Sequence, residues 1–200
     1  MKKIKMLLAA IACIAISASA VAQGTVDLDK MSKEERKAYE AKQDSIEHVA
    51  AVAALKSGNW MLIAEQRDGK ILSEREKPLN FLVVENNETI LFQTGANSSG
   101  GNNTMGGVTV DAKLKADKSK IEEKKNGELK AKFEGSGTYM NCRIQVKLSK
   151  VDGYAEISLS DNRCGAFVDL RGTIMPLNKN KVRVGKMFVP TGSGKWSGAM

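Results

Sequence analysis

Hydrophobic residues between positions 138 and 175 alternate with polar ones, in three segments separated by short turns. In the first segment every second residue is apolar: Met140, Cys142, Ile144, Val146 and Leu148. A period of two is typical of an antiparallel strand with one buried face. The second and third segments repeat this pattern around Ile157 and Leu170. Together they predict a meander of strands with one apolar side.

The turn between the first two of these strands contains Asp152-Gly153, which predicts a two-residue hairpin loop. Such a loop needs positive φ at both central residues, a conformation that aspartate and glycine tolerate. If Val151 pairs with Tyr154 across the loop, both strands bury the same face. Leu148 is then expected opposite Ile157.

Alternation also dominates the chain from residue 59 to the meander, with turn signals such as Asn86-Asn87 and Asn126-Gly127 between the apolar runs. The expected strands cover residues 60–66, 79–84, 89–94, 108–116, 118–124 and 128–133, and a last short strand is expected at 181–184. About eight to ten short strands joined by tight turns predict an all-β fold, either a barrel or a sandwich. We favour an antiparallel up-and-down β-barrel, because closure of a meander removes its exposed edges.

One α-helix is expected before the barrel. Ser32 and Glu35 form a capping-box pattern, in which each side chain satisfies a backbone amide at the first turn of a helix. The helix is predicted to run to about Lys56, because Ser57-Gly58 provides the glycine that commonly follows a helix C-terminus.

The first 22 residues match a secretory signal peptide. Lysines 2, 3 and 5 precede an apolar run at 6–16 that is too short to span a bilayer, and Ala20-Val21-Ala22 provides a signal-peptidase site. Cys13 raises the alternative of a lipoprotein, but the usual leucine three residues before it is absent. We therefore expect a secreted or periplasmic product without a lipid anchor.

These features predict four segments along the chain. They are a signal peptide at 1–22, a polar leader and N-terminal helix at 23–57, a β-barrel domain at 58–185 and a flexible Gly/Ser-rich tail at 186–200.

Charge excludes some classes of partner. Loss of the signal peptide removes three lysines and no acids, which lowers the formal net charge from +8 to +5. Lysines in the stretch 113–132 alternate with apolar residues or glutamates, as on a solvated strand face. Nucleic-acid sites interleave arginine and aromatic residues, which this stretch lacks. We expect no nucleic-acid partner, and no transmembrane segment in the mature chain.

Two cysteines, Cys142 and Cys164, remain after removal of the signal peptide. In an oxidising compartment such a pair is expected to form a disulfide. The hairpin register above places Cys142 opposite Arg163, next to Cys164, which favours this bond. The alternative is two free thiols packed as small hydrophobic side chains.

Three segments resemble domain-of-unknown-function family 4251, whose members are secreted by Bacteroides-type gut bacteria. They are the helix that ends before Asn59-Trp60, the strand start GGVTV at 106–110 and the closing segment LRGTIMPL at 170–177. The resemblance covers about residues 40–183 and implies a lipocalin-like barrel after an N-terminal helix. It implies no activity and no catalytic residues.

The residue types that usually carry catalysis or metal binding are scarce. His48 is the sole histidine, so a zinc site lacks ligands and a catalytic triad lacks partners. The stretch GSGK at 192–195 is similar to the end of a phosphate-binding loop but lacks the first glycine at the required spacing.

Paired carboxylates remain as an enzymatic alternative. The candidates Glu65, Asp68, Asp111, Glu156 and Asp169 are all expected on the outer face or in turns. We therefore predict no catalytic residue, metal or cofactor.

A long loop rich in glycine and asparagine lies between two predicted strands. As a rim at the barrel mouth it has seven candidate residues: Gly95, Asn97, Gly100, Gly101, Asn102, Gly106 and Gly107. Structureless loops of this length are often functional, but we favour a plain surface connection as the explanation of this loop.

The expected function is binding rather than catalysis. Inward-facing residues are apolar, so any ligand inside the barrel would be apolar or amphipathic. Five small residues decide whether such a cavity exists: Ala112, Ala116, Ala131, Ala155 and Ala166. The alternatives are an interaction module that contacts an envelope partner through its N-terminal helix, and a carboxylate-dependent hydrolase.

Overall fold

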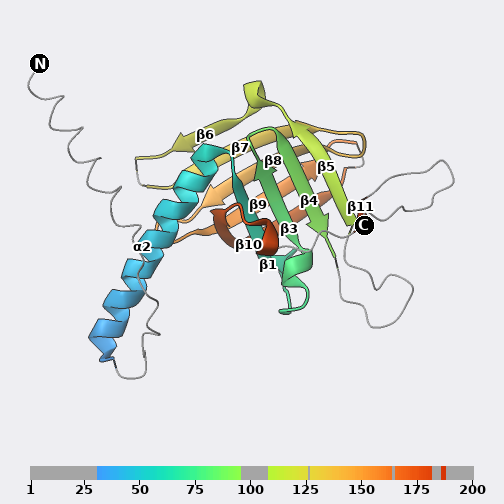
Figure 1. Cartoon of the computed structure of the whole chain (residues 1–200). Coiled ribbons are helices and arrows are strands. Elements are labelled where there is room, and N and C mark those ends of the chain that lie inside the picture. Colours follow the sequence, from blue (N-terminus) through green and yellow to red (C-terminus); the bar gives the residue numbers. More distant parts are fainter. Residues whose placement is uncertain (1–30, 96–107, 126, 164, 182–185, 188–200) are drawn as a thin grey trace, which may run out of the picture. The chain divides into compact units, whose positions relative to one another are not determined.

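In the computed structural model, eight antiparallel strands close into a β-barrel (Figure 1). The barrel strands are β1 (Trp60–Arg67), β3 (Phe81–Glu85), β4 (Thr89–Thr94), β5 (Val108–Leu114), β7 (Leu129–Ser136), β8 (Asn141–Leu148), β9 (Tyr154–Asp161) and β10 (Phe167–Pro176). Each pairs with the next in this order, and β10 pairs back with β1. The expected up-and-down barrel is confirmed.

Three short strands extend this barrel. β2 (Lys70–Ile71) pairs with β1, and β6 (Lys120–Glu123) pairs with β7. β11 (Lys186–Met187) runs parallel to the start of β5. The first two residues of the segment expected as a tail are therefore part of the sheet.

The structure describes residues 31–95, 108–125, 127–163, 165–181 and 186–187. The chain divides into two compact units, Met1–Glu40 and Ala41–Met200. Helix α2 (Lys33–Ser57) begins in the first unit with the expected capping box. Ser32 N donates to Glu35 Oε2 at 2.9 Å, and Glu35 N donates to Ser32 Oγ at 3.3 Å. These hydrogen bonds hold the pKa of the Glu35 carboxyl below its ordinary value.

The barrel interior holds one hydrophobic cluster with members from all eight barrel strands. Trp60 and Phe133 are among its largest buried side chains, and their ring centroids lie 5.5 Å apart. Helix α2 adds Ala51, Ala54 and Leu55 to the same cluster. The helix therefore completes the core rather than lying apart from it.

Contacts of α2 show which end of the barrel it covers. His48 Nδ1 lies 3.2 Å from Asp152 O, Lys56 Nζ lies 3.0 Å from Glu123 Oε2, and Asn87 N donates to Gly58 O at 2.9 Å. The turns after β3 and β8 lie at this end. At the opposite end, Leu72 and Met140 are buried in the same cluster.

A second apolar cluster lies on the outer face of the barrel. Met61, Phe81 and Val83 are buried there, and Ile63, Leu91, Met175 and Leu177 pack against them. The chain after β10 covers part of this face, where Asn178 N lies 3.2 Å from Met61 Sδ. β3 is thus buried on both faces, which explains its continuous apolar run Phe-Leu-Val-Val.

The pairing of β8 with β9 differs from the expected register by two residues. Leu148 pairs with Ala155 rather than with Ile157. Because the difference is an even number, each side chain keeps the face predicted for it. The alternating inward residues of both strands are accordingly buried as expected.

The reason for the shift is the conformation of the β8–β9 turn. Neither Asp152 nor Gly153 has positive φ, so the predicted two-residue loop does not form. Instead, the strands join at Ser149 N, which donates to Tyr154 O at 2.8 Å. Asp152 Oδ1 accepts from Tyr154 N at 3.1 Å and stabilises a longer loop at 150–153.

The strand expected at 108–116 ends earlier, at Leu114. A 3-10 helix at Ala116–Lys118 follows and turns the chain from β5 into β6. Of the five alanines expected to face inward, Ala116 and Ala166 are instead exposed, and Ala112, Ala131 and Ala155 are buried.

Close backbone approach at Gly172 leads to a stability prediction. A Cβ atom on Gly172 would lie 2.3 Å from Ile63 O, a backbone atom at the pairing of β1 with β10. We expect Gly172→Ala to lower the free energy of unfolding by about 2–3 kcal/mol, because the strands must separate to admit the methyl group. Urea denaturation measures this loss.

Gly135→Ala is the matched control. Its Cβ would approach the Cδ1 atom of Ile90 at 2.6 Å, and that atom ends a side chain that can rotate. We expect a smaller loss of stability for this variant. Equal losses in the two variants would contradict the backbone explanation.

Candidate functional site

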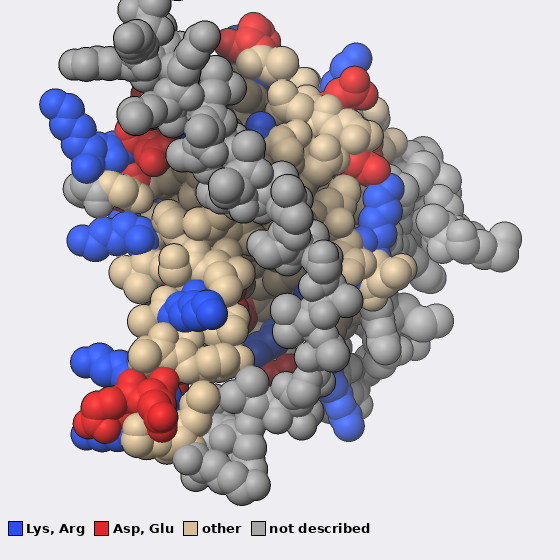
Figure 2. Space-filling model, turned by 60° about the vertical axis from the view of Figure 1, so that its left-hand side comes forward, with Lys and Arg blue, Asp and Glu red and all other residues tan. Residues whose placement is uncertain are grey.

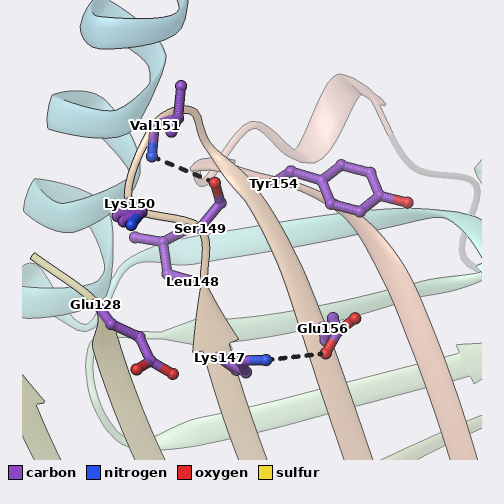
Figure 3. Close-up of a pocket in the computed structure, with 8 residues that line it drawn as sticks. All are labelled: Glu128, Lys147, Leu148, Ser149, Lys150, Val151, Tyr154 and Glu156. Atoms are coloured by element: carbon purple, nitrogen blue, oxygen red, sulfur yellow. Dashed lines mark hydrogen bonds and ion pairs between the residues drawn. The ribbon is translucent and has the colours of Figure 1, made fainter.

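A recess of about 470 Å³ lies at the β8–β9 turn (Figure 3). Its lining residues are Glu128, Lys147, Leu148, Ser149, Lys150, Val151, Tyr154 and Glu156. A neighbouring recess of about 210 Å³ shares Lys147 and Glu156 and continues over the outer faces of β7, β8 and β9. The larger volume falls within the range of small-molecule sites.

The turn that forms this recess is fixed from two sides. On one side His48 of α2 contacts Asp152 O, as described above. On the other side Ile174 N donates to Gly153 O at 2.8 Å. A Cβ atom on Gly153 would lie 3.3 Å from Glu47 O, so a glycine lets the turn approach the helix closely. The recess is thus built on a turn held between α2 and β10.

Most charges in the recess are already paired. Glu156 lies 3.7 Å from Lys147 Nζ and 3.3 Å from Arg171 Nη2 (Figure 3 shows the first pair). Glu128 lies 3.4 Å from Lys124 Nζ and 3.6 Å from Lys130 Nζ.

Lys150 differs from these residues because its charge is unpaired in the part of the chain that the structure describes. Within the described residues, no carboxylate lies within ion-pair distance of its ammonium group. Its positive charge is therefore available to an anion from outside.

Tyr154 contributes a ring to the recess. Partial burial, and then the nearby negative charge of Glu65, raise the pKa of its hydroxyl above the ordinary value. That hydroxyl points away from Lys150 in Figure 3. Tyr154 therefore does not direct its hydroxyl toward a group bound at Lys150.

Three exposed large apolar side chains are found on the two elements that meet at this corner. Ile46 and Val49 of α2 are 52% and 64% exposed, and Val151 of the β8–β9 turn is 55% exposed. Figure 2 shows that charges of both signs are interspersed with uncharged surface on the side that it presents. We call Ile46, Val49, Val151 and the larger recess the outer corner.

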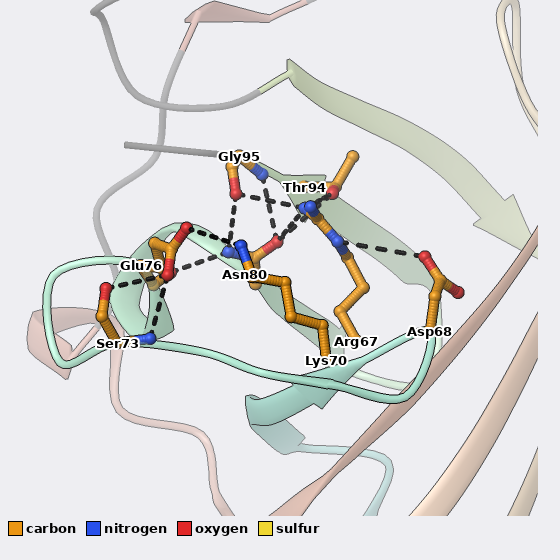
Figure 4. A network of polar contacts seen from close by, with 8 residues as sticks. All are labelled: Arg67, Asp68, Lys70, Ser73, Glu76, Asn80, Thr94 and Gly95. Carbon is orange, nitrogen blue, oxygen red and sulfur yellow. Dashed lines mark hydrogen bonds and ion pairs between the residues drawn. The ribbon is translucent and has the colours of Figure 1, made fainter. Parts of the chain in front are cut away.

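A polar network lies at the other end of the barrel, at the start of the predicted rim loop (Figure 4). Arg67 Nη1 donates to Asn80 Oδ1 at 2.7 Å, to Thr94 Oγ1 at 2.5 Å and to Gly95 O at 3.1 Å. Asn80 is fully buried, and its Nδ2 donates to Gly95 O at 2.8 Å. The network satisfies buried polar groups and anchors the first residue of the loop. The other six candidate residues lie outside the described residues: Asn97, Gly100, Gly101, Asn102, Gly106 and Gly107.

Of the carboxylates considered for catalysis, Asp68 and Asp169 are neighbours in the structure, and backbone hydrogen bonds join them. The five candidate carboxylates lie on the outer face or in turns, as expected: Glu65, Asp68, Asp111, Glu156 and Asp169. Asp169 accepts a hydrogen bond from Ser158 Oγ at 2.7 Å, and its backbone nitrogen donates to Asp68 Oδ1 at 2.9 Å.

Within the described ranges, no three His, Cys, Asp or Glu side chains gather as a metal site would require. No helix among the described residues has the length and apolar character to cross a bilayer.

Cys142 is a buried free thiol that faces the barrel interior. It pairs with Asp161 rather than with Arg163, because of the two-residue shift in register. Cys164, its expected partner, lies outside the described residues. The structure does not show the disulfide, which therefore remains a prediction.

Residues at the outer corner were missed by the sequence analysis. Val151 is an apolar residue inside a turn, and this mismatch is the signal that identifies it as exposed surface. Ile46 and Val49 are larger apolar residues of the same helix, and contacts with the barrel show that α2 buries Ala51, Ala54 and Leu55.

Cys142 gives a prediction about the pH dependence of stability. Burial is the main cause that raises the pKa of its thiol from 9.0 to about 11. Because the folded state holds this proton more tightly, the stabilisation is complete below pH 9 and is lost as the pH rises toward 11. In a reducing buffer, we expect the free energy of unfolding to fall by about 2 kcal/mol more between pH 8 and 10.5 in the wild type than in Cys142→Ala. Parallel pH profiles of the two proteins would refute this explanation.

Comparison with known proteins supports the fold and the resemblance. No family model and no curated protein matches the chain. The crystal structure of a DUF4251 family protein from Bacteroides eggerthii DSM 20697 does match, with 26% sequence identity and a TM-score of 0.56. The match covers 68% of this chain and 91% of that chain. The expected resemblance is thus confirmed: in sequence and in fold, this chain is similar to a protein of the DUF4251 family.

Proposed function

We propose that this protein is a non-enzymatic binding protein of the cell envelope that engages an envelope component through its outer corner. The observation that carries the proposal is the contrast between a closely packed barrel interior and a recess on the outside, next to exposed apolar side chains. The features of a signal peptide at residues 1–22 support the envelope location.

The packing of the interior argues against a small ligand inside the barrel. Ala112, Ala131 and Ala155 are small, and all three are buried in the same cluster as Trp60 and Phe133. At Gly135, a single added methyl group would lie 2.6 Å from Ile90 Cδ1 and 3.1 Å from Ala112 Cβ. The side chain of Ile90 therefore occupies the interior space beside Gly135 and Ala112. Ala112 therefore lies beside a large neighbour rather than beside an open space.

The outer corner has the properties of an interaction surface. Three of the large apolar side chains exposed in the described structure lie on the two elements that meet here, and exposed apolar surface commonly marks sites of interaction. Ile46, Val49 and Val151 come from two elements, α2 and the β8–β9 turn, that a hydrogen-bond contact at His48 holds together. This arrangement also supports the alternative expectation that the N-terminal helix contacts the partner.

Site-specific photo-crosslinking tests the proposal in intact cells. A benzophenone amino acid is placed at Val49, at Val151 or, as control, at Phe167, which is 60% exposed but lies at the opposite end of the barrel. We expect the same adduct from positions 49 and 151 and its absence from position 167. The adduct from position 49 should disappear when Val151→Asp is added. Different adducts from the two corner positions, or the same adduct from position 167, would refute the proposal.

One observation favours a second candidate, a ligand held inside the barrel. The Nε1 atom of Trp60 is buried and is the one such side-chain atom without a hydrogen-bond partner in the described structure. A buried donor without a partner carries a cost, which a bound ligand with an acceptor oxygen would remove.

Native mass spectrometry of the mature protein, purified from its own compartment, distinguishes the two candidates. An interior ligand predicts additional mass that is lost on denaturation, and it predicts that Trp60→Phe reduces the fraction of protein carrying this mass. The outer-corner proposal predicts that any bound mass is sensitive to Val151→Asp and is unchanged in Trp60→Phe.

A further inference from the structure

We infer that the recess at the β8–β9 turn binds a small amphipathic anion, with the ammonium group of Lys150 paired to a carboxylate and the apolar body of the ligand against Val151 and Tyr154. This inference rests on the proposed function and names the class of ligand for the same corner.

Charge identifies the polar end of the ligand. Both carboxylates in the recess are paired: Glu156 with Lys147 and Arg171, and Glu128 with Lys124 and Lys130. Lys150 lines the same recess without a carboxylate partner among the described residues. An incoming anion gains a charge partner there, whereas an incoming cation meets carboxylates that are already neutralised. The recess therefore selects for negative charge.

Shape and apolar surface identify the rest of the ligand. Val151 and Tyr154 line the recess together with the backbone around Leu148, whose side chain is buried in the barrel core. Val151 is 55% exposed, so its side chain offers apolar surface at the edge of the recess. A volume of about 470 Å³ accommodates a molecule of drug-like size rather than a single inorganic ion. A carboxylate attached to an alkyl or aromatic body matches both features.

Dodecanoate, kept below its micelle-forming concentration, is the probe. Isothermal titration calorimetry of the mature full-length protein should show one site. We expect Lys150→Glu and Val151→Asp each to weaken binding about tenfold or more, because the first places like charges together and the second removes apolar contact.

Matched controls keep this test specific. Lys118→Glu makes the same charge change at an exposed lysine outside the recess, and Phe167→Asp makes a comparable apolar-to-acid change at the far end of the barrel. Both should bind dodecanoate within about twofold of the wild type, since neither residue lines the recess. Acetate, which lacks the alkyl chain, and dodecyltrimethylammonium, which reverses the charge, should each bind about tenfold more weakly or worse. Circular dichroism confirms that all variants are folded.

The outcomes separate the inference about the anion from the proposed outer-corner function. Absence of dodecanoate binding, or equal binding by wild type and Lys150→Glu, overturns the inference about the anion. If the corner positions still give their shared crosslink, the proposed outer-corner function stands without it. Dodecanoate binding that Trp60→Phe abolishes and Lys150→Glu leaves unchanged would place the ligand inside the barrel and overturn both.

Discussion

The pairing of β1 with β10 is the constraint on which the rest of the fold depends. These strands begin and end the meander, so their hydrogen bonds turn an open sheet into a barrel. The pairing brings together residues more than about a hundred positions apart, a costly ordering of the chain. Gly172 allows the two backbones to approach closely beside a bulge in β1. Every inward side chain owes its enclosed surroundings to this closure.

Closure also explains why the barrel has two sides of different character. On β1, β3 and β4 both faces are apolar, and the chain after β10 covers part of the outer one. On β7, β8 and β9 the outer face carries lysines and glutamates in cross-strand pairs. One half of the barrel wall is thus committed to internal packing. The other half remains available for recognition, and the candidate recess lies there.

The outer corner depends on how the helix is used. Helix α2 places Ala51, Ala54 and Leu55 in the core, so its larger residues Ile46 and Val49 remain exposed. The β8–β9 turn meets the helix at this point and adds Val151. An aspartate-stabilised loop in place of a two-residue hairpin gives this turn the length to reach the helix. The proposed recognition surface is therefore a consequence of local turn chemistry as well as of closure.

Local patterns determined the strands, the helix cap and the inward face of the meander, because period-two alternation and the Ser32–Glu35 box act over a few residues. The same patterns predicted a barrel, since sequential hairpins leave few other arrangements. Only the tertiary structure decided the two-residue shift in the register of β8 and β9. This shift keeps every side chain on the same face, so the alternation in the sequence does not reveal it. It likewise decided which lysine lacks a partner and which apolar side chains of α2 stay exposed. Those properties depend on neighbours from distant strands, which alternation along one strand does not reveal.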